Sequence, residues 1–220
     1  MDLNKPRLLL LCCVLASAVA TSSGQNDAIE RPTSEPYKGD LAIFEDPARA
    51  KNLQIDRVLD LLGIRRGSRV ADVGAGSGWF TVRAARRVAK DGVVYAVEIN
   101  PDYVHYIEAR AKKAKLANVR TVLGKPDDPL LSPASVDAVL LLKTYHEVAQ
   151  PIALLRHVRA AMRPGAKLGI IDKNGKGDDH GLDANLVIKE AAQAGFKLVA
   201  QYDFVKADKL DYFVIFAPNE

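Results

Sequence analysis

The amino-acid sequence predicts a doubly wound α/β domain, in which helices cover both faces of a mostly parallel sheet. Three observations lead to this prediction. Short apolar stretches alternate along the chain with longer stretches that have the apolar spacing of helices. The apolar run from Val136 to Leu142 is continuous, as in a strand buried on both faces. Three alternate glycines, Gly74, Gly76 and Gly78, join a strand to a helix and leave room for a ligand near the backbone.

Residues 1–20 have the pattern of a secretory signal peptide. Lys5 and Arg7 precede the apolar run 8–20, which ends in small residues that fit a cleavage site. As a helix this run would span about 20 Å, too short for a bilayer core of about 30 Å. We expect cleavage after Ala20 and export to the periplasm or the medium. The alternative is an uncleaved segment that anchors the protein to a membrane.

Residues 21–44 are predicted to be a flexible leader to a domain of residues 45–220, because they are polar and contain Pro32 and Pro36. Both cysteines of the chain lie in the predicted signal peptide, so the mature protein would offer no thiolate for catalysis or for a metal. The chain has 31 Lys and Arg and 27 Asp and Glu, a net charge of +4. Without a dense basic stripe, this mild balance argues against a nucleic-acid partner.

Local signals predict each element of the domain in order. A helix begins at Asp46-Pro47, a cap followed by a first-turn proline, and closes at Gly63. The elements expected after it are strand 69–73, helix 79–89, strand 93–99, helix 101–116, strand 119–123, strand 136–142, helix 151–162, strand 167–171 and helix 183–194. Two closing strands, 197–205 and 212–217, are near enough in the chain to pair antiparallel.

The glycine loop predicts the class of ligand. A helix follows the loop at once, so its free N–H groups point at the same place as the loop. Glu98 ends the next strand, where an acid can accept hydrogen bonds from both hydroxyls of a ribose. The dinucleotide pattern G-x-G-x-x-G would put its third glycine at Trp79. Asp72 disfavours a pyrophosphate and suits an ammonium group, which favours S-adenosylmethionine over a dinucleotide.

The chain resembles the class I S-adenosylmethionine-dependent methyltransferases over roughly residues 45 to 217. It looks closest to small members without insertions, similar to quinone-biosynthesis methyltransferases. The motifs stand in family order and spacing: VADVGAGSGWF (70–80), VVYAVEINP (93–101), VLGKPDDPL (122–130), VDAVLLLKTYHEV (136–148) and RPGAKLGIID (163–172). The resemblance implies a Rossmann-like seven-stranded sheet, mostly parallel with an antiparallel C-terminal strand.

The resemblance also implies roles for individual residues. Glu98 would bind the ribose hydroxyls, Ile99 would lie against the adenine, and Asp127 or Asp128 would accept from the adenine amino group. Those two aspartates are equally well explained as turn residues, since prolines flank them. The residues expected around the cofactor are Asp72, Gly74, Ala75, Gly76, Gly78, Glu98, Ile99, Asp127, Asp128 and Lys143.

Residues 143–147 would border the transferred methyl group and its acceptor. His146 and Glu147 are the acid–base candidates there, and Tyr145 would line the acceptor pocket. His146 is equally well explained as a packing residue at a strand end. His180 lies in a glycine-rich stretch that is either a lid or a plain surface loop. No two histidines have metal-ligand spacing, so no metal is predicted.

The resemblance implies methyl transfer by in-line displacement. A small-molecule acceptor, methylated on oxygen, carbon or nitrogen, is expected because the domain has no large insertion that would recognise a macromolecule. The main alternative is an exported protein that binds S-adenosylmethionine or a nucleoside without catalysis. An NAD-dependent oxidoreductase is less favoured because of the glycine spacing. Export would separate the protein from the cytoplasm, where the cofactor is made. The acceptor and the oligomeric state are not predicted.

Overall fold

The computed structural model of the chain describes Met1, residues 31–206 and residues 209–219. Apart from Met1, the predicted signal peptide and its cleavage site lie outside the described residues, as does the first part of the predicted leader. Within the described ranges, none of the helices has the length and apolar character needed to cross a membrane.

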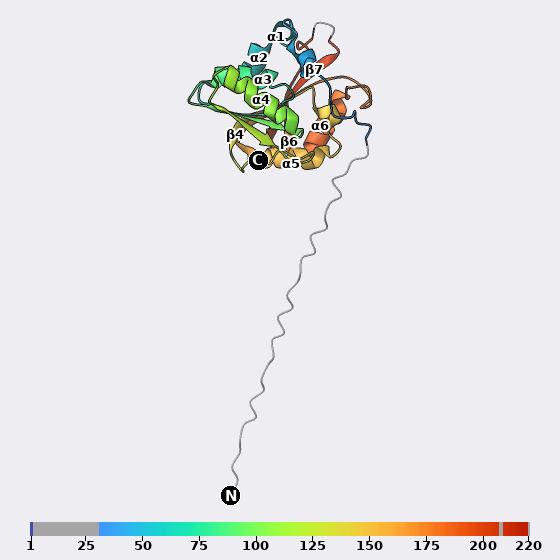
Figure 1. Cartoon of the computed structure of the whole chain (residues 1–220). Helices are drawn as coiled ribbons and strands as arrows, with labels where there is room; N and C mark the ends of the chain where they lie inside the picture. The colour runs from blue at the N-terminus through green and yellow to red at the C-terminus, as the bar shows by residue number, and fades with distance from the viewer. Residues whose placement is uncertain (2–30, 207–208, 220) are drawn as a thin grey trace.

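The described residues contain one seven-stranded sheet with the strand order β3-β2-β1-β4-β5-β7-β6 (Figure 1). The strands are β1 (Arg69–Val73), β2 (Val93–Glu98), β3 (Val119–Leu123), β4 (Val136–Leu142), β5 (Met162–Lys173), β6 (Phe196–Tyr202) and β7 (Asp211–Pro218). The first five strands pair in parallel, and β7 pairs antiparallel with both β5 and β6. The predicted doubly wound fold is thereby confirmed. Strand order reverses between β1 and β4, where open α/β sheets bind their ligands.

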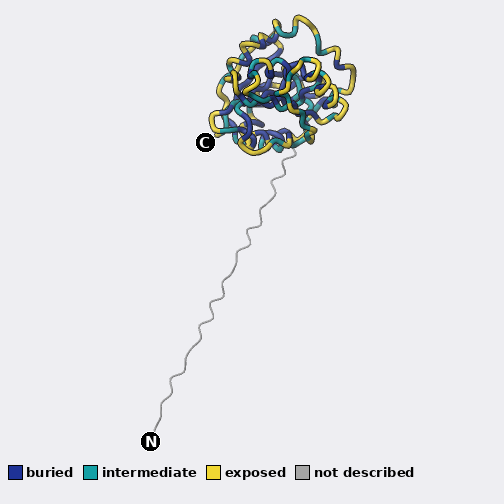
Figure 2. Tube along the Cα trace, turned by 60° about the vertical axis from the view of Figure 1, so that its left-hand side comes forward, coloured by how far each residue is buried: buried dark blue, intermediate teal, exposed yellow. Residues whose placement is uncertain are grey.

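Helices cover both faces of this sheet. They are the 3-10 helices η1 (Leu41–Glu45) and η2 (Tyr145–Glu147), and α1 (Arg49–Asn52), α2 (Ile55–Leu61), α3 (Trp79–Val88), α4 (Pro101–Lys113), α5 (Pro151–Ala161) and α6 (Ala184–Gln193). Apolar residues of α2 and α3 pack with one set of strand side chains, and those of α5 and α6 pack with the alternate set. Figure 2 shows this buried core surrounded by more exposed loops and helix surfaces.

Several predicted elements differ by a few residues at their ends, as the strand predicted at 197–205 does from β6, and two differ more. The first predicted helix is split, because Gln54 has a left-handed φ of 46° between α1 and α2. Asp46 does cap a turn there, because its side chain accepts a hydrogen bond of 2.8 Å from the N–H of Ala48. The strand predicted at 167–171 begins earlier, since Met162 already pairs with Val136 before a register shift. Long-range pairing therefore extends this strand through Pro164 and Gly165, which the sequence alone would place between the helix and the strand.

The described part of the predicted leader packs against the domain, and we call residues 31–38 the strap. It has no regular secondary structure. Arg31 lies in the strap with its side chain only 3% exposed, and its Nε is 2.9 Å from Glu190 of α6. The N–H of Ser34 donates to the carbonyl of His146 at 3.2 Å. The sequence predicted a flexible leader here. In the structure these contacts hold the strap against the domain.

Candidate active site

The glycine loop forms a cradle at the carboxyl end of β1. Its three glycines have φ values of 73°, 53° and 69°, which residues other than glycine rarely adopt. The N–H groups of Gly74 and Ala75 both donate to the carbonyl of Val97, so the loop is tied to β2. A Cβ at Gly74 would lie 2.2 Å from the side chain of Thr144, whereas one at Gly76 would meet nothing within 4 Å. The loop is thus tight against β4 on one side and open at Gly76.

Asp72 is the last residue but one of β1, and its side chain is buried beside this loop. Its Oδ2 accepts a hydrogen bond of 2.6 Å from the hydroxyl of Thr81. Burial and the nearby charge of Glu98 together raise the pKa of Asp72 to about 7, although Thr81 and Arg49 act in the opposite direction. A cation placed beside this carboxyl group would stabilise its ionised form.

Glu98 ends β2 and holds the loop from the other side. Its Oε2 accepts from the N–H of Gly76 at 2.9 Å, and its Oε1 accepts from the N–H groups of Ile99 and Asn100 at 2.8 and 3.3 Å. A carboxylate has about four acceptor positions, so one remains for a ligand. Ile99 stands next to it with 39% of its surface exposed.

A pocket of about 540 Å³ joins these groups at the carboxyl ends of β1, β2 and β4, a volume typical of small-molecule sites. The strap contributes residues 33–38 to its lining. Of the residues predicted from the sequence, the pocket is lined by Asp72, Gly74, Ala75, Gly76, Glu98, Ile99, Lys143 and Glu147. A larger hollow of about 780 Å³ lies at the amino ends of β2 and β3 and contains none of the predicted site residues.

Three predicted cofactor residues do not line the pocket. Gly78 is the left-handed N-cap of α3. Asp128 accepts from the N–H of Leu130 at 2.8 Å, the contact expected of a turn residue. The carbonyl of Asp127 bonds to Nδ1 of His157 at 2.8 Å. The adenine contact stays a prediction for both aspartates, while the turn role has a hydrogen bond to support it at Asp128.

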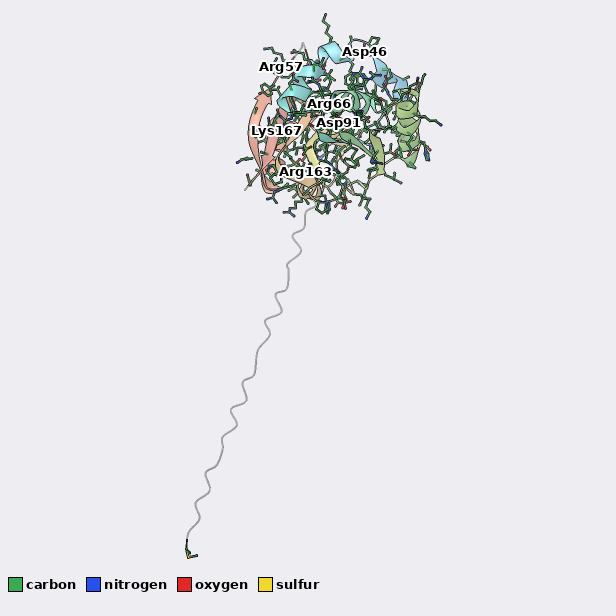
Figure 3. All side chains as sticks on the ribbon, turned by 90° about the vertical axis from the view of Figure 1, so that its left-hand side faces the viewer. Asp46, Arg57, Arg66, Asp91, Arg163 and Lys167 are labelled. Carbon is green, nitrogen blue, oxygen red and sulfur yellow. The ribbon has the colours of Figure 1, made fainter. Side chains whose placement is uncertain are left out.

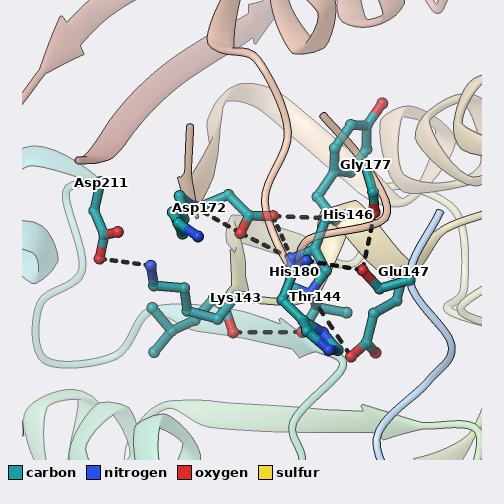
Figure 4. A network of polar contacts seen from close by, with 12 residues as sticks. Lys143, Thr144, His146, Glu147, Asp172, Gly177, His180 and Asp211 are labelled. Atoms are coloured by element: carbon teal, nitrogen blue, oxygen red, sulfur yellow. Dashed lines mark hydrogen bonds and ion pairs between the residues drawn. The ribbon is translucent and has the colours of Figure 1, made fainter. Parts of the chain in front are cut away.

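The three residues predicted to be catalytic lie together in η2 but have different partners, and Figure 4 shows two of them, His146 and Glu147. Tyr145 is fully buried and donates its hydroxyl to Glu190 at 2.8 Å, away from the pocket lining. His146 is also buried, with Nδ1 2.9 Å from Asp172 and Nε2 3.8 Å from Glu147. Among the three, only Glu147 lines the pocket.

Glu147 and Lys143 stand at the end of the pocket next to η2. Burial raises the pKa of Glu147 to about 7, although the charge of His146 and a hydrogen bond from the backbone of Tyr37 act in the opposite direction. Lys143 has a left-handed φ of 58°, and its Nζ pairs with Asp211 at 2.5 Å. The ammonium group of Lys143 is therefore held toward the start of β7.

Sequence reasoning missed the polar groups that brace the cradle. Glu45 receives two hydrogen bonds from the guanidinium of Arg110, at 2.5 and 2.8 Å, and one from the hydroxyl of Ser77 at 2.9 Å. The guanidinium of Arg49 lies over the ring of Trp79, 4.6 Å from its centroid. These side chains come from helices and from the glycine loop, where polar groups are ordinarily solvated, so no spacing pattern marks them.

Comparison with known proteins shows what part of the domain is similar to. Residues 70–165 match a family model described as a methyltransferase domain. The tRNA (adenine(58)-N(1))-methyltransferase TrmI of Thermus thermophilus is 29% identical over 160 residues, 72% of this chain and 60% of that protein. The 27-O-demethylrifamycin SV methyltransferase of Amycolatopsis mediterranei is 31% identical over 119 residues, 53% of this chain and 43% of that protein. The chain thus spans about half the length of these relatives. The suggested likeness to quinone-biosynthesis enzymes stays a prediction.

Solved structures match the same fold over most of the chain. A SAM-dependent methyltransferase from Aquifex aeolicus has a TM-score of 0.74 at 24% identity, covering 81% of this chain and 98% of that one. A TehB-like SAM-dependent methyltransferase from Corynebacterium glutamicum has a TM-score of 0.62 at 17% identity, covering 82% and 100%. Residues 70–165 therefore match a methyltransferase domain, and the chain shares the Rossmann-like fold of solved SAM-dependent methyltransferases.

Proposed function

We propose that this protein binds S-adenosylmethionine in the pocket and directs its methyl group to a small-molecule acceptor by in-line displacement. The observation that carries the proposal is the convergence of Asp72, the glycine loop and Glu98 on one pocket from the ends of β1 and β2. The bound cofactor supplies a methyl group on a sulfonium, which needs no further activation. The protein then has to bind the cofactor, align the acceptor with the methyl group and exclude water.

The residues present suit the parts of this cofactor. The buried carboxyl group of Asp72 would hold the ammonium, since burial leaves it without water to stabilise its charge. Gly76 faces open space where a Cβ would meet nothing, so ligand atoms can approach its backbone closely. The remaining acceptor position of Glu98 would serve a ribose hydroxyl, and exposed Ile99 would cover the adenine.

The strap supports a small acceptor. Residues 33–38 of the strap line the pocket together with Lys143 and Glu147, so the acceptor end has a wall on the side away from the sheet. The relatives named above act on a tRNA and on a rifamycin. The fold alone therefore does not determine the acceptor. We assign oxygen, carbon or nitrogen of a small molecule as the acceptor atom, bordered by Glu147 rather than by the buried Tyr145.

We also propose that the protein is exported, because the apolar run 8–20 ends in a fitting cleavage site. Mass spectrometry of the protein recovered from fractionated cells should then find a chain that begins at Thr21 outside the cytoplasm. A full-length chain held in the membrane fraction would favour the anchor instead, and a full-length cytoplasmic chain would contradict export.

The cofactor assignment is tested by calorimetric titration with S-adenosylmethionine, with NAD as a second ligand. We expect S-adenosylmethionine alone to bind, and Glu98→Ala to weaken it about ten- to hundredfold, because hydrogen bonds to a charged group contribute about 1.5–3 kcal/mol each. Glu108→Ala is the matched control, since this glutamate lies on α4 outside the pocket and bonds to Thr121.

Two results would count against the proposal in different ways. A folded protein that does not bind S-adenosylmethionine would contradict the cofactor assignment altogether. A protein that binds it, but forms no S-adenosylhomocysteine with a panel of phenols, amines and carbon acids, would support the non-catalytic binding protein instead.

A further inference from the structure

A cluster of side chains that can ligate a metal ion lies beside the cofactor cradle. His146 and Glu147 come from η2, and His180 comes from the loop between β5 and α6. One ligand atom of each lies within 4.8 Å of the other two (Figure 4). Nothing in the cofactor proposal uses His146 or His180, so the cluster needs its own explanation.

Asp172 sets the orientation of His146. Both of its carboxylate oxygens lie within hydrogen-bond distance of Nδ1 of His146, at 2.9 and 3.0 Å, and one also accepts from the N–H of His146 at 3.1 Å. A carboxylate can only accept, so Nδ1 donates, and in the neutral ring Nε2 then carries the lone pair. That lone pair is on the nitrogen nearer Glu147, 3.8 Å from its Oε1. A carboxylate behind a histidine is the usual support of a metal-binding imidazole.

The strap joins the two segments that carry the histidines. The N–H of Ser34 donates to the carbonyl of His146 at 3.2 Å. Its hydroxyl accepts from the N–H of His180 at 3.0 Å and donates to the carbonyl of Gly177 at 2.9 Å. Ser34 is 6% exposed, so these bonds are shielded from water. A single buried residue therefore keeps His180 beside His146.

We propose that His146, Glu147 and His180 bind a zinc ion. Two imidazoles and one carboxylate are a donor set of catalytic zinc sites, in which a fourth position stays open. Magnesium and calcium are disfavoured because they prefer oxygen ligands. Glu147 also lines the cofactor pocket, so the ion would sit at the wall of that pocket. The binding itself does not depend on methyl transfer.

The cluster needs little rearrangement to hold the ion. Zinc holds its ligands at about 2.0–2.2 Å, so two ligand atoms of one ion are at most about 4.4 Å apart. The three ligand atoms here lie within 4.8 Å of one another, and Nε2 of His146 is 3.8 Å from Oε1 of Glu147. Any contraction would come from the side chain of His180, which is exposed although its backbone is held by Ser34, whereas His146 is buried and held by Asp172.

Calorimetric titration of the full chain with zinc sulfate tests the proposal directly. The protein is purified without a histidine tag, and Cys12→Ser and Cys13→Ser remove the two thiols that also bind zinc. We expect one zinc ion per chain. His180→Ala and the isosteric Glu147→Gln should weaken it at least about tenfold, because even supporting residues change metal affinity by about 10–100-fold. His105→Ala, which removes an exposed histidine of α4, should leave it unchanged.

Every other outcome overturns the assignment. If zinc does not bind, or binds equally to the His180→Ala protein, the rings are only packed edge to face, at a centroid distance of 5.8 Å. A preference for iron(II), which also uses two histidines and a carboxylate, would keep the site but replace the metal. Titration of the same samples with S-adenosylmethionine separates this result from a failure of the cofactor proposal, and thermal melts show that each variant is folded.

Discussion

Among single residues, Asp72 ties the chemistry of the pocket to pH. Its pKa is raised to about 7, from an ordinary value of 3.8, because its carboxyl group is buried. The folded protein thus holds this proton more tightly than the unfolded chain. Between about pH 4 and pH 7, the contribution of Asp72 to stability falls as pH rises, and above about pH 7 it is constant.

Cofactor binding should have the opposite dependence on pH. The ammonium of S-adenosylmethionine prefers the ionised carboxylate, so we expect its affinity to rise between about pH 5.5 and 7.5 and then to level off. Calorimetry across this range measures the effect. Asp72→Asn should bind weakly with a flat profile, and Asp91→Asn, at an exposed site, should follow the original protein. An affinity independent of pH in the unchanged protein would show that Asp72 does not face the ammonium.

At the level of elements, the β1–α3 loop predicts unequal effects of glycine substitutions. Alanine in a left-handed conformation costs about 1–2 kcal/mol. Gly76→Ala should lose about that much stability, since nothing lies within 4 Å of the added Cβ. Gly74→Ala should lose clearly more, because its Cβ would meet Thr144 at 2.2 Å. Urea denaturation measures both changes.

Gly165→Ala is the control for the loop series. Gly165 also has a positive φ with open space around it, but it lies in β5 away from the pocket. Gly76→Ala and Gly165→Ala should therefore be equally stable, and only Gly76→Ala should weaken S-adenosylmethionine. Equal stability of Gly74→Ala and Gly76→Ala would mean that Thr144 moves aside without cost.

The elements also show how far sequence reasoning reaches. β1, β3 and β4 have the predicted bounds, because an apolar run between turn residues is a local signal. Asp72, Gly76 and Glu98 could be placed in one pocket because they follow or end neighbouring parallel strands. The sequence could not predict the contacts of Arg31, Ser34 and His180. Their partners are distant in the chain, and no periodicity in the sequence indicates such contacts.

For the molecule as a whole, the strap is held by a buried ion pair that should matter for stability. Arg31 and Glu190 have side chains 3% and 1% exposed, and Arg31 also donates to the carbonyls of Tyr145 and Val148. Burial raises the pKa of Glu190, while the charge of Arg31 acts in the opposite direction. Arg31→Ala would leave the glutamate without its cation and should cost about 3–5 kcal/mol of unfolding free energy.

An exposed pair provides the comparison for this prediction. Arg66 and Asp91 lie together on the surface, 2.6 Å apart, with side chains 68% and 47% exposed (Figure 3). Arg66→Ala should change stability by no more than about 1 kcal/mol, because water screens the pair. Chemical denaturation of both variants makes the comparison. Similar small losses would mean that the strap separates from the domain before the domain unfolds.

The position of β7 sets when this protein can finish folding. β7 follows β6 in the chain but lies between β5 and β6 in the sheet. Ribosomes add about 5–20 residues per second from the N-terminus, so the apolar edge of β5 waits without a partner until residues 211–218 have been made. A nascent chain that stalls before that point cannot complete the sheet, because the strand between β5 and β6 is missing. It exposes an open sheet edge, the kind of surface that chaperones shield and that makes incomplete chains aggregate.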